Sequence, residues 1–177
     1  MLVKGAALLF ITLIASGCNQ TTDESSFTEY DGNTLSIAVI GDSPANDFEQ
    51  VSFQEEEPNV LTEEHAYDAF MVTEAYFEEL SQSEWTSVFA SMETPIFFAG
   101  IETQEFVFTE DSITYEESPF TTAEHISGFV SAPDDEEEFK TWGYSSTESE
   151  GEDGPPEWSY HAMFKDIEAF RDRQFEG

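Results

Sequence analysis

Apolar residues along the chain gather in short runs of two kinds, which predict alternating strands and helices. Residues 35–40 form an apolar run that ends at Gly-Asp-Ser, and residues 67–72 and 95–101 form two more. Short runs without regular polar alternation are typical of strands that are buried on both faces. Between the last two runs, the apolar residues of 74–92 recur every three or four positions, which is the spacing of a helix.

The remaining segments extend this order of elements. We expect shorter strands at 50–53 and 139–146, a hairpin or an edge strand from 105–108 and 112–117, and a closing helix over 158–175. Buried strands that alternate with helices favour an α/β domain. The expected fold is therefore a single α/β domain with a mostly parallel central sheet flanked by helices, with an antiparallel hairpin as an option at its edge.

The N-terminal residues have the three-part order of a secretory signal. Lys4 precedes an apolar run over 5–15, and two small residues then lead into Cys18. The run is shorter than the roughly 20 residues that span a bilayer; a short uncleaved anchor helix is the alternative. Residues 15–18 resemble a bacterial lipobox, which implies that the signal peptide 1–17 is removed and that Cys18 becomes the lipidated first residue.

Cys18 is also the only cysteine of the chain. A single cysteine cannot form an internal disulfide, and lipidation supplies another reason for its presence. Diacylglycerol on the sulfur with a further acyl chain, such as palmitate, anchors a protein stably. Two or more lipid chains keep a protein on a membrane, whereas a single chain binds it only reversibly. We expect residues 18–33 to form a flexible polar tether and residues 34–177 one domain, held on the outer face of the cell membrane.

The charge of the chain excludes some partners. It has 39 acidic and 5 basic residues, a formal net charge of −34, which repels nucleic acid and anionic lipid head groups. Disordered acidic chains lack aromatic residues, whereas this one has 17 Phe, 6 Tyr and 3 Trp. The composition indicates an acidic shell over an aromatic core. Salt screens the repulsion among the carboxylates of such a surface. We therefore expect a halophilic or alkaliphilic source.

Ser43 stands at the end of the first apolar run. Residues 37–43, "IAVIGDS", resemble the opening block of the serine hydrolases named for their Gly-Asp-Ser motif, which implies Ser43 as a nucleophile. That family closes with Asp-x-x-His, but here the last histidine, His161, has Trp158 three positions before it. We therefore expect Asp42 and Ser43 to line a binding crevice at the carboxyl end of the strand without doing chemistry. The hydrolase remains the alternative.

Acidic runs at 55–57, 134–138 and 148–153 raise a second alternative, a surface protein that binds divalent cations. Carboxylate oxygens are ligands for Ca²⁺ and Mg²⁺, but a calcium loop alternates its ligands and places glycine at the bend. None of the three runs does so, and no metal-site spacing links the three histidines. The sequence predicts no metal site and no cofactor.

Aromatic residues flank the acidic loop 147–157. Trp142, Tyr144 and Trp158 lie on either side of it. They are candidates for a platform that binds a sugar or a peptide. The alternative is a hydrophobic cluster that closes the edge of the sheet.

The chain as a whole resembles small lipid-anchored proteins of Bacillus-like bacteria. The segments that carry the likeness are the lipobox, "IAVIGD", "YDAFMV" with its acidic helix, "PIFF", and "WGY" before an acidic loop. The resemblance implies an exported, lipid-anchored α/β domain and implies no activity. We expect a non-catalytic role in binding or in the envelope, with a small molecule, a cation or an envelope component as partner.

Overall fold

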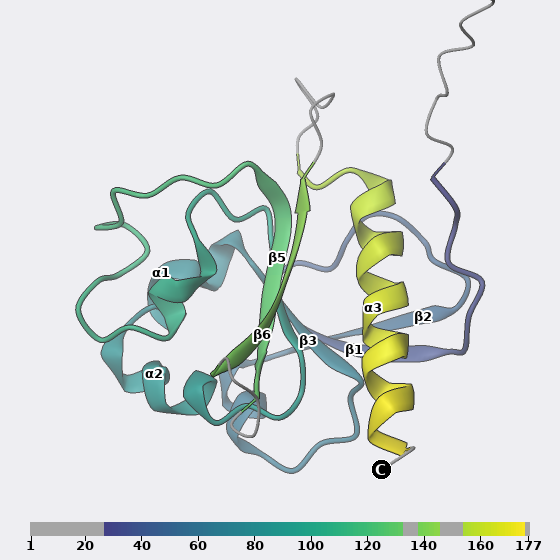
Figure 1. The fold of residues 1–177 in the computed structure, drawn as a ribbon, viewed down its shortest axis with the longest axis horizontal. Helices are drawn as coiled ribbons and strands as arrows, with labels where there is room; N and C mark the ends of the chain where they lie inside the picture. The colour runs from purple at the N-terminus through teal and green to yellow at the C-terminus, as the bar shows by residue number, and fades with distance from the viewer. Residues whose placement is uncertain (1–26, 133–137, 146–153, 176–177) are drawn as a thin grey trace, which may run out of the picture.

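The computed structural model describes residues 27–132, 138–145 and 154–175. Six strands form one sheet in the order β2-β1-β3-β4-β5-β6 (Figure 1). The strands are β1 (Leu35–Ile40), β2 (Val51–Glu56), β3 (Ala69–Thr73), β4 (Ile96–Ala99), β5 (Glu124–Ser131) and β6 (Phe139–Ser145).

The sheet is mixed. Strand β1 pairs in parallel with β2 and β3, and β3 pairs in parallel with β4, but the β4–β5 and β5–β6 pairings are antiparallel. The expectation of a mostly parallel sheet is therefore wrong. The connection from β4 to β5 returns to the edge where β4 ends, since Ala99 pairs with Ile126 near the start of β5, so β5 has to run back along β4.

Strand β1 is covered on both faces, as the sequence predicted. Leu35, Ile37 and Val39 belong to the core on one side of the sheet. Ala38 and Ile40 belong to the core on the other side. All five residues are fully buried. An apolar run without polar alternation thus marks a central strand, because neither of its faces meets water.

Helices cover the two faces unequally, as Figure 1 shows. A single long helix, α3, packs on one face through Tyr160, Met163, Phe164 and Ile167, which recur at helical spacing. The closing helix is thus confirmed. The short connections cover the other face. The helical elements are η1 (Pro58–Thr62), η2 (Glu74–Tyr76), α1 (Phe77–Leu80), α2 (Ser83–Ala90), η3 (Glu105–Phe108) and α3 (Glu157–Phe175).

The helical pattern over 74–92 does not form one continuous helix. It breaks at Ser81 and Gln82, between α1 and α2. The Ser81 hydroxyl and the Gln82 side-chain amide both donate to the carbonyl oxygen of Glu78, each at 3.1 Å. The Ser81 hydroxyl oxygen also accepts the backbone N–H of Tyr115 at 2.9 Å. Polar side chains thus compete for backbone groups that a continuous helix would pair internally.

The hairpin or edge strand expected from 105–108 and 112–117 is wrong. Residues 105–108 form the 3-10 turn η3, and residues 112–117 contain no strand. Phe108 explains the difference, because its ring stacks on that of Phe98 in β4 with centroids 3.9 Å apart. The segment therefore lies over the face of the sheet, and the antiparallel edge is formed by β5 and β6.

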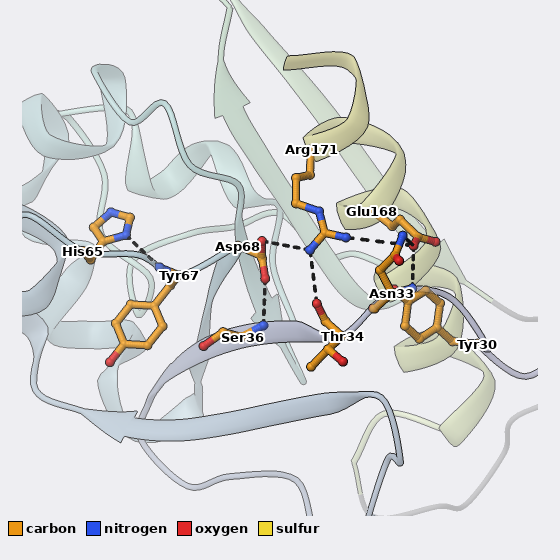
Figure 2. A network of polar contacts seen from close by, with 9 residues as sticks. All are labelled: Tyr30, Asn33, Thr34, Ser36, His65, Tyr67, Asp68, Glu168 and Arg171. Atoms are coloured by element: carbon orange, nitrogen blue, oxygen red, sulfur yellow. Dashed lines mark hydrogen bonds and ion pairs between the residues drawn. The ribbon is translucent and has the colours of Figure 1, made fainter. Parts of the chain in front are cut away.

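Residues 27–34, the N-terminal segment, lie along α3 (Figure 2). The Tyr30 backbone N–H donates to Nδ1 of His161 at 2.9 Å, and the Asn33 backbone N–H donates to Oε1 of Glu168 at 2.6 Å. The side chain of Tyr30 is buried in the core beneath α3. The packed domain therefore includes residues that the sequence analysis assigned to the tether, because an aromatic ring there enters the core.

Close packing at Gly128 in β5 yields a prediction. Its neighbours in the register are Phe97 and Trp142, whose ring centroids lie 5.4 Å apart. An added Cβ would overlap Cδ1 of Phe97 and lie 2.5 Å from the carbonyl oxygen of Ile96. We expect Gly128→Ala to lower the free energy of unfolding by about 1–3 kcal/mol, measured by urea denaturation.

Gly143→Ala is the matched control for this prediction. Gly143 lies in the neighbouring strand β6, and a Cβ there would meet only the carboxylate end of Glu124, which can rotate away. We expect a change within about 0.5 kcal/mol. Equal losses for the two variants would contradict this account of the packing.

Candidate functional site

The connections of the parallel strands leave β1 and β3 toward opposite faces of the sheet. The β1–β2 connection, residues 41–50, lies on the α3 side, since its Phe48 belongs to the core beneath that helix. The β3–β4 connection carries α1 and α2, whose Phe77 and Phe89 belong to the core on the other side. Such a reversal opens a crevice at the carboxyl ends of the strands, where α/β sheets bind ligands.

A cleft of about 740 Å³ lies at this place. Its walls come from the residues that follow β1, β3 and β4 and from the start of α3. They are Asp42, Ser43, Pro44, Ala45, Asn46, Thr73, Glu74, Ala75, Ala99, Gly100, Gly154, Pro155 and Tyr160. The cleft therefore joins four segments that are far apart in the sequence.

The turn after β1 is fixed to the end of β3. Gly41 has a φ of 110°, in the left-handed region that favours glycine. The next backbone N–H, of Asp42, donates to Oγ1 of Thr73 at 3.1 Å. The backbone N–H of Ser43 donates to Oε1 of Glu55 in β2 at 3.3 Å. Both N–H groups thus hold the turn itself, which leaves the side chains of Asp42 and Ser43 at the wall of the cleft.

The cleft is acidic. Its lining carries the carboxylates of Asp42 and Glu74, and the described part of the lining includes no lysine, arginine or histidine. Tyr160 adds a phenol, and burial raises its pKa to about 12, which keeps it a neutral hydrogen-bond donor at neutral pH. The site offers carboxylate acceptors and a phenol, an arrangement that suits ligands with positive charge or hydrogen-bond donors.

Two of the three histidines serve structural contacts away from Ser43. His65 precedes β3 and so lies at the amino ends of the parallel strands, opposite the cleft. Its Nδ1 accepts the backbone N–H of Tyr67 at 3.4 Å. His161 is buried beneath the N-terminal segment and accepts the N–H of Tyr30. Neither imidazole is hydrogen-bonded to Ser43.

The third histidine, His125, lies at the start of β5, near the carboxyl ends of the parallel strands, where the cleft is. Its carbonyl oxygen accepts the backbone N–H of Gly100 at 2.8 Å, and its ring centroid is 6.0 Å from that of Trp158. Within the described residues, no hydrogen bond joins Ser43 to this imidazole either.

None of the aromatic candidates Trp142, Tyr144 and Trp158 is among the described residues that line the cleft with Asp42 and Ser43. Tyr144 is buried, and its hydroxyl donates to Oδ2 of Asp166 on α3 at 2.8 Å. Burial is the main cause that raises the pKa of Tyr144. Trp142 packs against Phe97 and Phe170, and the Lys140 ammonium lies 4.8 Å from its ring centroid. These side chains contact α3 from the outer strand β6.

Thr73, Glu74 and Gly100 line the cleft but were not singled out from the sequence. Thr73 and Glu74 follow the predicted apolar run 67–72, and Gly100 lies near the end of the predicted run 95–101. The signal that could have found them is therefore the carboxyl end of every predicted parallel strand, and not only of the first.

A second hollow, of about 480 Å³, lies beside Phe70 and Met92, at the amino ends of β3 and β4. Two hydroxyls in its lining are bonded to backbone carbonyls of their own segments, Thr62 to Asn59 and Ser91 to Ser87. Its polar side chains do not converge on a common point in the way that a ligand site needs.

The fold and the cleft define a mixed α/β domain with a crevice at the reversal of its strand order. Comparisons with protein-family models, with curated proteins and with solved structures returned no match to the chain. No helix within the described ranges is long and apolar enough to cross a membrane. In the same part of the chain, no group of three His, Cys, Asp or Glu side chains is arranged to hold a metal ion.

Thr73 provides a test of how the cleft wall is held. Thr73→Val removes the oxygen that accepts the Asp42 N–H. We expect a loss of about 1 kcal/mol in the free energy of unfolding and faster hydrogen exchange of the Asp42 amide. Thr73→Ser keeps the hydroxyl and is the matched control, for which the Asp42 amide should remain protected. Equal exchange in the two variants would contradict the role of Thr73.

Proposed function

We propose that this chain is an exported protein, anchored by lipid on Cys18 to the outer face of the cell membrane, whose domain binds a ligand and does not catalyse a reaction. The observation that carries the proposal is the cleft between β1 and β3. It combines carboxylates and a phenol, while Ser43 at its wall has no hydrogen bond to a histidine in the described part of the chain. A serine without a base in reach is not activated.

The N-terminal sequence supports the anchor. It has a charged start, an apolar run and a lipobox-like ending at the sole cysteine. The domain is packed from residue 27 onward, so residues 19–26 would join the lipid to the domain. Eight extended residues reach at most about 30 Å. A lipid on Cys18 would hold the domain that close to the membrane surface.

The electrostatics of the cleft support a class of ligand. Asp42 and Glu74 disfavour an anion, and no basic side chain in the lining compensates for them. A small molecule of the envelope that is neutral or carries an ammonium group would meet carboxylate acceptors.

Cys18→Ser tests the anchor. In cells fed an alkyne analogue of palmitate, the wild-type protein should incorporate label and enter the detergent phase with the membrane fraction. The Cys18→Ser variant should lose the label and should either be released from the membrane or remain as an uncleaved precursor. A sharper control adds Ser25→Cys to Cys18→Ser, which restores a thiol outside the lipobox and should remain unlabelled. A wild-type protein that is soluble, lacks residues 1–17 and carries a free thiol would refute the anchor.

The hydrolase alternative is tested at Ser43. Because no histidine is positioned to activate the hydroxyl, a fluorophosphonate probe should label the wild type no more than it labels Ser43→Ala. The two proteins should have the same unfolding midpoint, which shows that the comparison is between folded chains. Stoichiometric labelling of the wild type that disappears in Ser43→Ala would overturn the non-catalytic proposal and establish an enzyme.

A further inference from the structure

The N-terminal segment is attached to α3 at two separate places. At the first, the backbone N–H of Tyr30 donates to Nδ1 of His161, and the ammonium of Lys165 donates to the carbonyl oxygen of Thr28. Phe27 lies over the same place, with its ring centroid 5.2 Å from that of His161.

The second attachment lies further along α3, as Figure 2 shows. The backbone and side-chain N–H groups of Asn33 donate to Oε1 of Glu168 at 2.6 and 2.7 Å. The guanidinium of Arg171 donates to the carbonyl oxygen of Thr34 at 3.2 Å and pairs with Asp68 at the same distance. Charged side chains hold this second attachment, whereas the first combines the charged Lys165 with the imidazole of His161.

The contact with His161 depends on its protonation state. A backbone N–H can only donate, so Nδ1 has to carry a lone pair in order to accept the N–H of Tyr30. The side chain of His161 is only 9% exposed. The rings of Phe27, Phe48 and Phe164 lie within 5.1–6.0 Å of it and limit the access of water.

We propose that His161 is a proton-sensitive latch, which holds Phe27–Tyr30 on α3 when neutral and releases them when it takes up a proton. Both nitrogens of an imidazolium are donors, so two N–H groups would face each other across the 2.9 Å that now separates Tyr30 N from Nδ1. A buried N–H that loses its acceptor is costly, and the segment regains a partner only by moving into water.

The charged groups around His161 act on the same equilibrium. On its own helix, Oε1 of Glu157 lies 3.5 Å from Nε2, and Lys165 follows one turn later. The β1–β2 connection packs Phe48 against His161, and Asp47 and Glu49 precede and follow Phe48 in the sequence.

The N-terminal segment carries two further carboxylates, Glu29 and Asp31, which flank Tyr30 and are exposed. The hydrogen bond from Tyr30 needs an unprotonated Nδ1 and so opposes proton uptake at that nitrogen. Because the attached segment disfavours the proton, attachment persists above the pH at which His161 is protonated and is lost below it. Histidine ordinarily changes charge between about pH 5 and 8.

Release stops at the second attachment. Gly32 lies between the two attachments. Asn33 remains bonded to Glu168, which is no part of the first attachment. Each residue freed before Gly32 adds at most about 3.3–3.6 Å to the path toward residue 18. Release would let the domain move further from the membrane only if Cys18 carries the proposed lipid. The release itself does not depend on that lipid.

Amide hydrogen exchange of the full chain tests the latch. Protection factors of the Tyr30 and Asn33 amides are measured by NMR from about pH 8 to pH 5, the range in which histidine titrates. We expect the protection of Tyr30 to fall about tenfold per pH unit once His161 is protonated, as a single coupled proton requires. The protection of Asn33 should stay constant, which reports that the rest of the segment remains attached.

Three variants make the test specific. His161→Asn retains an acceptor oxygen near the position of Nδ1 and does not titrate, so Tyr30 should stay protected over the whole range. His161→Phe removes the acceptor, and Tyr30 should be unprotected at every pH. His65→Asn changes a histidine that makes a similar but exposed contact, and should behave as the wild type.

The comparison of the wild type with His161→Asn decides the outcome even where His161→Phe does not fold. Constant protection of Tyr30 in the wild type would overturn the proposal. A fall in protection that persists in His161→Asn would overturn it as well, because the proton would then act elsewhere.

Discussion

The packing of one helix against one strand supports everything else in this domain. Strand β1 lies inside the sheet and has apolar side chains on both faces. The fold therefore requires another element to pack over Leu35, Ile37 and Val39. Helix α3 is that element. The helix runs from the cleft toward the amino ends of the parallel strands. It supplies Tyr160 to the cleft, His161 to the first attachment of the N-terminal segment and Arg171 to the second. A loss of this packing would remove the site together with the core.

The parts of the fold that the sequence predicted are those in which burial alone decides the structure. Continuous apolar runs marked β1, β3 and β4, and apolar residues at helical spacing marked α3. The prediction of a mostly parallel sheet was wrong, because a buried strand has the same composition whether its neighbour is parallel or antiparallel. The break at Ser81 depends on Tyr115, a partner far along the chain, and no local pattern contains it.

The candidate site divides in the same way. Asp42 and Ser43 were found because they directly follow the first predicted strand. Thr73 and Gly100 became visible only once the strand order was known, since adjacency of carboxyl ends is a property of the sheet. Tyr144 has a contact that local inference does not reveal. An aromatic residue beside a polar loop looked available to a ligand, but its hydroxyl is bonded to Asp166 on α3, a partner that the local sequence does not indicate.

The direction of α3 has a practical consequence for handling the molecule. The helix begins beside the cleft, and its last turns lie at the opposite edge, where Arg171 contacts Asp68 ahead of β3 (Figure 1). The N-terminal segment enters beside His161, near the first end. A fluorophore or an immobilising tag placed after Phe175 would therefore leave the mouth of the cleft open, whereas one placed just before Phe27 would crowd it. Surface attachment through the carboxyl terminus is the geometry in which a ligand screen reports on the cleft.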